Sequence, residues 1–203
     1  MKNDDRPMQK CDKWSGRYRG IGYEVSCHYR DWYDHDERNG EPRRACWTFY
    51  IYIPEQMIPE AKRDRFIAKR HDPERMYGDP RFYDYYATTL AELDWHGDIT
   101  YYELHSADLP GHRMIQAGCD YSHGFDGGRS YTAEYVERDA KKCIDSLHAN
   151  HPDLLVRDWY DGSFHPREEM EETPQGLLSA QGKAKIAKWD AENAERKAKE
   201  TPK

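Results

Sequence analysis

The stretch "IGYEVSCHYR", residues 21–30, decides the fold because its side chains alternate with a period of two. Its odd-numbered positions, from Ile21 to Tyr29, are apolar, aromatic or cysteine, whereas the even-numbered positions are small, polar or charged. This alternation is typical of a strand with one dry and one wet face. A second strand is predicted over "ACWTFYIYIP", residues 45–54, which ends at Pro54 because proline has no N–H to donate to a ladder.

Two further strands and a helix follow later in the chain. The strands "DITYYELH" (98–105) and "HRMIQAGCD" (112–120) flank a turn-forming segment. Thr132 is a good N-cap, and from Val136 onward apolar residues recur at helical spacing along one stripe. We therefore predict an α+β fold. It consists of an antiparallel sheet of about four or more strands, one amphipathic helix packed on one face, and a polar C-terminal helix.

The chain divides into three parts by composition. Residues 1–13 are charged and aperiodic, which predicts a flexible N-terminal tail, and residues 14–165 are predicted to form the α+β domain. Residues 166–203 are predicted to be a charged C-terminal extension, mostly of helix-forming residues. Within the domain, residues 55–93 are irregular, and only a short helix beginning after Pro59 is predicted there.

The composition excludes several classes of protein. The net charge of -7 argues against general nucleic-acid binding, which requires a basic face. Five widely spaced cysteines without a CxxC pair argue against a zinc ribbon or a thioredoxin-like motif. The N-terminus lacks an apolar signal segment, and no run is long and apolar enough for a membrane helix. We therefore expect a cytoplasmic protein with no cofactor and no membrane partner.

The stretch "AGCDYSHGFDGGRSY", residues 117–131, suggests where a site lies. If the strands at 98–105 and 112–120 form a hairpin, "DWHG" (94–97) lies beside the end of the second strand. The predicted ligand or partner site then contains six residues from these two stretches: Trp95, His96, Asp120, His123, Asp126 and Arg129.

This group of residues has three interpretations. Histidine and aspartate in a strand-to-helix connection often only cap N–H groups and hold a turn. The same residues suit a ligand or partner site, with Arg129 beside a helix N-terminus to hold an anion. They also suit acid–base or metal chemistry. No metal is expected, but if one binds, its predicted ligands are His96, Asp120 and His123. Cys119 is interpreted as a buried small residue and not as a nucleophile.

The blocks "RGIGYE", "WTFYIYIP", "DWHGDITYYE" and "GCDYSHGFD" resemble a group of small proteins of phages and other mobile elements. The resemblance covers about residues 14–150 and is most specific in "WHG.ITYYE" and "GCDYSH". Asp98 stands where this group would have a second glycine. The resemblance implies a setting, an accessory gene expressed in a host cytoplasm, and it carries no activity and no catalytic residues.

These observations lead to a hypothesis of function with two alternatives. The first hypothesis is a non-enzymatic binding protein, an accessory or anti-defence inhibitor that blocks a host protein through an acidic, aromatic-rich surface. The first alternative is a small metal-dependent hydrolase or nuclease that uses the His/Asp cluster. The second is a nucleotide-binding protein with an aromatic sheet face as its platform. The expected partner is a host or phage protein.

Overall fold

The computed structural model describes most of the chain, in seven parts. These are residues 11–29, 45–72, 82–109, 111–122, 126, 131–174 and 176–200. His123 and Arg129 of the predicted site lie outside the described residues.

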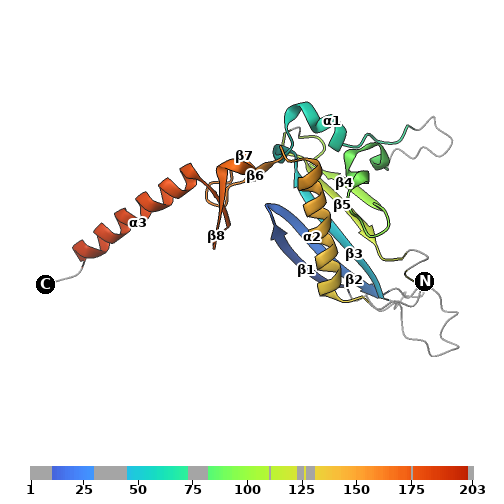
Figure 1. Ribbon diagram of the computed structural model, residues 1–203, viewed down its shortest axis with the longest axis horizontal. Coiled ribbons are helices and arrows are strands. Elements are labelled where there is room, and N and C mark those ends of the chain that lie inside the picture. The colour runs from blue at the N-terminus through green and yellow to red at the C-terminus, as the bar shows by residue number, and fades with distance from the viewer. Residues whose placement is uncertain are drawn as a thin grey trace, which may run out of the picture.

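A five-stranded antiparallel sheet forms the centre of the protein (Figure 1). In spatial order its strands are β1 (Cys11–Tyr18), β2 (Ile21–Tyr29), β3 (Ala45–Pro54), β5 (Met114–Asp120) and β4 (Tyr101–His105). This confirms the predicted α+β class and four of the strands. The strand β1 was not predicted. It starts at Cys11, so the last three residues of the predicted flexible tail belong to the sheet.

The hairpin of β4 and β5 has nearly the predicted register. Tyr101 pairs with Gly118 and Leu104 with Ile115, so paired positions sum to 219. From the sequence, residues near 104 and 113 are predicted to lie opposite each other, which gives a sum of about 217 with a slip of one or two residues, and the observed register lies within that slip. The "DWHG" stretch is therefore carried toward the end of β5, as predicted.

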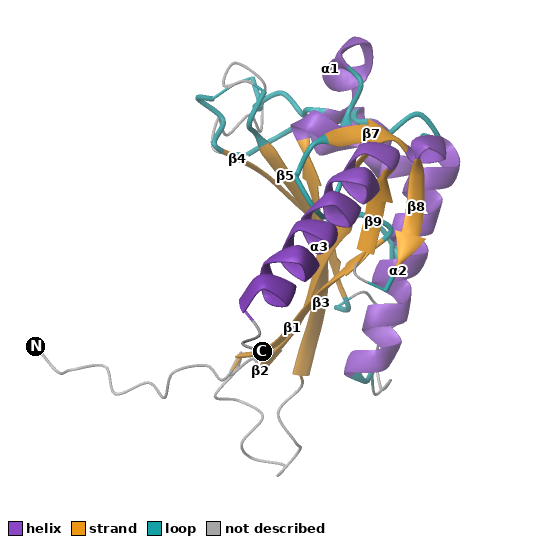
Figure 2. Cartoon of the chain, turned by 90° about the vertical axis from the view of Figure 1, so that its left-hand side faces the viewer, coloured by secondary structure: helices purple, strands orange, loops and turns teal. Residues whose placement is uncertain are grey.

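The helix α2 (Ala133–Asn150) packs on one face of the sheet (Figure 2). The Thr132 side chain accepts a hydrogen bond from the backbone N–H of Tyr135 and so caps the helix. The predicted stripe faces the sheet, because five residues of the helix are fully buried: Val136, Ala140, Cys143, Ile144 and Leu147. They pack against the apolar positions of β2 and β3, which makes this face the dry one.

Short helices between β3 and β4 fill out the dry face. They are η2 (Glu55–Met57), η3 (Glu60–Lys62), α1 (Arg63–Phe66), η4 (Tyr85–Ala87) and η5 (Thr89–Glu92). The predicted helix after Pro59 is thus present as η3 and α1. Phe66 and Leu90 are fully buried in the core. The Ala68 N–H donates to the Tyr102 hydroxyl at 3.0 Å, which ties this segment to β4.

The C-terminal part is a module of two hairpins and a helix. Its elements are β6 (Leu155–Arg157), β7 (Phe164–Pro166), η7 (Arg167–Glu169), β8 (Met170–Thr173), β9 (Gly176–Ser179) and α3 (Ala180–Glu200). The predicted C-terminal extension therefore contains the short helix η7 and the β8–β9 hairpin before its long helix begins at Ala180. In Figure 1, α3 projects away from the rest of the protein. Among the described residues, no helix is both long and apolar enough to cross a membrane.

Candidate functional site

His96 is the centre of a polar cluster near the start of α2. Its Nε2 lies 2.8 Å from Asp126 Oδ1, and its Nδ1 lies 3.8 Å from Asp139 Oδ2. The imidazole side chain is only 10% exposed. His96 comes from the loop before β4, Asp126 from the chain between β5 and α2, and Asp139 from α2 itself. The predicted proximity of His96 and Asp126 is therefore observed.

Two tyrosines complete this cluster, which we call the His96 corner: His96, Tyr121, Asp126, Tyr131 and Asp139. The His96 and Tyr121 rings stack with centroids 3.8 Å apart. Tyr121 donates its hydroxyl proton to Asp139 Oδ2 at 2.9 Å, and Tyr131 donates to Asp126. Burial, followed by the charge of Asp139, raises the pKa of Tyr121 far above its usual value. The phenol is therefore a neutral donor at all physiological pH values.

The other described residues of the predicted site have different surroundings. Trp95 is a core residue whose ring stacks on Phe49 and whose Nε1 donates to the Leu90 carbonyl at 2.6 Å. Asp120 accepts the Ser122 N–H at 2.9 Å through Oδ1, which makes it the cap of a local turn. The contact of Asp120 corresponds to the structural interpretation of the aspartates, and Trp95 is part of the core.

Cys119 lies beneath the His96 corner and is 1% exposed. Burial raises the pKa of its thiol well above the usual range. A nucleophilic cysteine has to be a thiolate, so this thiol is unsuited to covalent catalysis.

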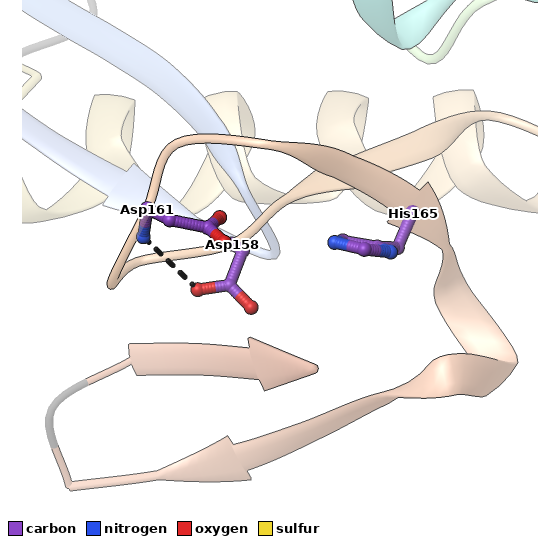
Figure 3. Close-up of side chains that lie close together, drawn as sticks. All are labelled: Asp158, Asp161 and His165. Atoms are coloured by element: carbon purple, nitrogen blue, oxygen red, sulfur yellow. Dashed lines mark hydrogen bonds between the residues drawn. The ribbon is translucent and has the colours of Figure 1, made fainter. Parts of the chain in front are cut away.

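A second cluster, Asp158, Asp161 and His165, lies in the β6–β7 hairpin (Figure 3). Its ligand-type atoms all lie within 4.8 Å of one another, a separation that suits a metal ion. This cluster was not predicted, although "DWYDGSFH" has two carboxylates and a histidine within eight residues.

The oxygens of this second cluster already have protein donors. Asp158 Oδ1 accepts the Tyr160 N–H at 2.7 Å, and its Oδ2 accepts the Ser179 N–H at 2.7 Å. Hydrogen bonds from Ser163 lower the pKa of Asp161 to about 2, and the Lys185 ammonium lies 3.2 Å from its Oδ2. A cation bound here would compete with this ammonium. The cluster therefore serves as a brace between the hairpin and α3.

The wet face of the sheet presents a different surface. We call six of its residues the tyrosine face: Glu24, Tyr50, Tyr52, Tyr101, Glu103 and Gln116. Sheet pairing places them in adjacent rows, because Tyr50 and Tyr101 both oppose Gly118, while Tyr52 and Glu103 both oppose Gln116. All six side chains are half-buried or exposed.

Contacts within the tyrosine face order its rings. The rings of Tyr50 and Tyr101 meet edge to face with centroids 5.1 Å apart. A Cβ at Gly118 would lie 2.4 Å from Tyr50 Cδ1, so the missing side chain allows the Tyr50 ring to lie close to the strand. Tyr101 donates its hydroxyl to Glu103, and burial raises its pKa well above the usual value. The face thus offers apolar rings, neutral hydroxyls and carboxylates.

The chain was compared with protein-family models, curated proteins and solved structures. No protein-family model, curated protein or solved structure matches the chain.

Proposed function

We propose that the protein is a non-enzymatic binding protein that engages a host protein through the tyrosine face. The observation that carries the proposal is the contrast between the two faces of one sheet. The face under α2 is packed with apolar side chains, whereas the opposite face presents ordered tyrosines and carboxylates. Aromatic residues with a polar tip are enriched at protein interfaces because they bury a large area and still satisfy their hydroxyls.

Charge favours a basic partner for this face. The chain carries a net charge of -7, and Glu24 and Glu103 lie on the tyrosine face itself. Lys13 pairs with Glu24 at 2.9 Å, and Arg17 lies on the same face of the sheet opposite Gly22, so the β4 end with Glu103 is the acidic end of the face. An acidic end of this kind suits a basic site on the partner, such as the nucleic-acid channel of a host nuclease or other defence protein. The resemblance to phage and mobile-element proteins supports the role of an anti-defence inhibitor.

The His96 corner supports a structural role in preference to hydrolysis. Both ring nitrogens of His96 face carboxylates, and the hydroxyls of Tyr121 and Tyr131 are donated to the same two carboxylates. These contacts join the loop before β4, Asp126 and α2. A metal or a substrate would have to displace them.

A capture experiment tests the proposal. Wild-type protein and the double variant Tyr101→Ala, Glu103→Lys are immobilised and exposed to host lysate, and captured proteins are quantified by mass spectrometry. Tyr135→Ala is the matched control, because Tyr135 is an exposed tyrosine on α2. We expect a nucleic-acid-binding protein to be retained by the wild type and the control but lost with the double variant.

A second measurement identifies the mode of inhibition. The captured protein should lose its affinity for nucleic acid when wild-type protein is added, and should keep it when the double variant is added. Equal capture by all three proteins would contradict the proposal, as would a captured protein that binds nucleic acid equally well with and without the wild type.

A further inference from the structure

The helix α3 is held firmly at its base but is solvent-exposed along the rest of its length. Its first turn is fixed by the Ser179 side chain, which accepts the Gly182 N–H at 3.0 Å, and its second turn by the pair of Lys185 with Asp161. From Ala187 to Lys197 every side chain is exposed except that of Asn193, which is half-buried. Figure 1 shows that this segment projects beyond the two hairpins.

Large aromatic side chains are exposed on this module. Trp189 on α3 is 59% exposed, and Trp159 at the tip of the β6–β7 hairpin is 58% exposed. Trp189 lies one turn beyond Lys185, whose ion pair with Asp161 directs this side of the helix toward the hairpin tip. Tryptophan is the residue most enriched among the side chains that dominate binding energy at interfaces.

Over residues 180–195 the charges of α3 are segregated on either side of Trp189, and its last turn carries Arg196, Lys197, Lys199 and Glu200. Residues 180–189 contain Lys183, Lys185 and Lys188 and no acid, whereas residues 190–195 contain Asp190, Glu192 and Glu195 and no base. When two such helices lie antiparallel about a twofold axis at Trp189, the basic segment of each lies opposite the acidic segment of the other. Residues 180–195 of the helix are therefore complementary in charge to the same residues of a second copy.

We propose that α3 binds α3 of a second copy of this chain, antiparallel, with Trp189 at the twofold axis. Twofold dimers with a self-complementary patch are the commonest oligomers. Helical spacing puts Lys185, Lys188, Glu192 and Glu195 on one flank of the Trp189 face, and in an antiparallel pair each flank meets the same flank of the partner helix. The lysines of one copy then meet the glutamates of the other on this flank.

The geometry of the module permits this pairing. A helix of 21 residues is roughly 32 Å long, so two projecting helices overlap over several turns while the sheets stay apart. The far end of the partner's helix then reaches the hairpin tip that carries Trp159 and Tyr160. Such a contact is at the small end of specific interfaces, so a weak, concentration-dependent dimer is expected.

Charge-reversal variants of the full chain test the proposal by sedimentation equilibrium over a wide range of concentration. Lys188→Glu and Glu192→Lys each place like charges across the axis, and each should weaken self-association at least tenfold. An equimolar mixture of the two variants makes both cross-axis pairs attractive, so it should form a heterodimer with near wild-type affinity. The mixture does not restore the pair of Lys188 with Glu192 within one helix, so its recovery reports contact between copies.

Two more variants complete the experiment. Trp189→Ala should weaken association at least tenfold while the helix persists, because alanine is the best helix former. Lys142→Glu, the same charge change on α2, should leave association unchanged. A wild-type chain that stays monomeric at the highest concentration would overturn the proposal. So would a dimer insensitive to Trp189→Ala, or a mixture that shows no recovery.

Discussion

Replacing Asp158 by Asn should loosen the C-terminal module without unfolding the sheet. Asp158 is 1% exposed and accepts backbone N–H groups from two separate elements. Its Oδ1 accepts from Tyr160 at 2.7 Å and from Asp161 at 3.4 Å, and its Oδ2 accepts from Ser179 at 2.7 Å. One carboxylate therefore holds the hairpin turn and the start of α3 together.

The magnitude follows from the loss of one acceptor. An asparagine keeps a single oxygen, so if that oxygen stays on the hairpin, its NH₂ group faces the Ser179 N–H. Loss of a hydrogen bond to a charged acceptor, with a buried donor left unsatisfied, costs about 2–4 kcal/mol. Because each 1.4 kcal/mol is a factor of ten, the Ser179 amide should exchange with solvent roughly 30- to 700-fold faster.

Hydrogen exchange read out by mass spectrometry measures this effect. Peptides covering residues 176–186 should exchange faster in Asp158→Asn, while peptides from β3 keep wild-type rates. Asp94→Asn, at an exposed aspartate paired with Lys142, is the matched control and should leave both regions unchanged. The reasoning is refuted if the 176–186 peptides exchange at the wild-type rate, or if β3 loses protection to the same extent.

The same carboxylate makes the attachment depend on pH. Burial opposes its ionisation, but hydrogen bonds from Ser179, Tyr160 and Asp161 outweigh burial and hold the pKa of Asp158 below its usual value. Because the folded pKa lies below the unfolded value of about 3.9, the ionised group stabilises the folded form above that pH. This contribution is lost as the pH falls further. Wild-type protection at Ser179 should therefore decline below about pH 4, whereas Asp158→Asn should show a smaller decline, because only Asp161 of this cluster still loses its charge there.

Three further outcomes are expected. Hydrogen bonds from Arg113 lower the pKa of the buried Glu55 to about 2. Glu55→Gln should therefore lower the free energy of unfolding by about 2–3 kcal/mol at neutral pH. In thermal unfolding, the difference in stability between wild type and Glu55→Gln should shrink as the pH falls from about 4.5 toward 2. Gly118→Ala would place a Cβ 2.5 Å from the Phe49 carbonyl oxygen. Urea unfolding should therefore show a free energy of unfolding lower by about 1–3 kcal/mol, and an unchanged midpoint of unfolding would contradict the clash. The buried Cys119 thiol should react with a thiol reagent only as the protein unfolds, and rapid modification of native protein would contradict its burial.

The sheet was largely predictable because strand burial leaves a period of two in the sequence. The strands β2 and β3 have one dry face each, and their alternation marks them clearly. The strand β1 lies at the edge of the sheet, where Lys13, Ser15 and Arg17 are exposed and even Trp14 is 43% exposed. An edge strand buries too little for its pattern to stand out, so β1 was missed.

The His96 corner was partly predictable. The proximity of His96 and Asp126 was predictable because the register of the β4–β5 hairpin follows from the two strands alone. Asp139 was missed, although it lies three residues after Val136 and four before Cys143, where it is half-buried at the border of the apolar stripe of α2. A carboxylate beside an apolar stripe needs a polar partner when the stripe is buried. The position of Asp139 in the sequence was therefore the signal that could have predicted its contact with this cluster.

The brace at Asp158 and the tyrosine face depend on contacts between distant segments. The hydrogen bond from Ser179 to Asp158 spans 21 residues without a periodic pattern. The pairing of Tyr50 with Tyr101 across Gly118 required the strand order, in which β5 lies between β3 and β4. Sequence periodicity determines which face a residue occupies but not which strand lies next to it.

The strand order also affects how the chain is made. The strand β3 is complete at Pro54, yet its second partner β5 ends at Asp120, and the helix that covers its apolar side ends at Asn150. Ribosomes add about 5–20 residues per second, so synthesis of the missing segment takes roughly 5–20 s. During that interval "WTFYIYI" has an unpaired edge and an uncovered hydrophobic side, which is a hazard for aggregation. Nascent chains in this window should therefore be chaperone clients.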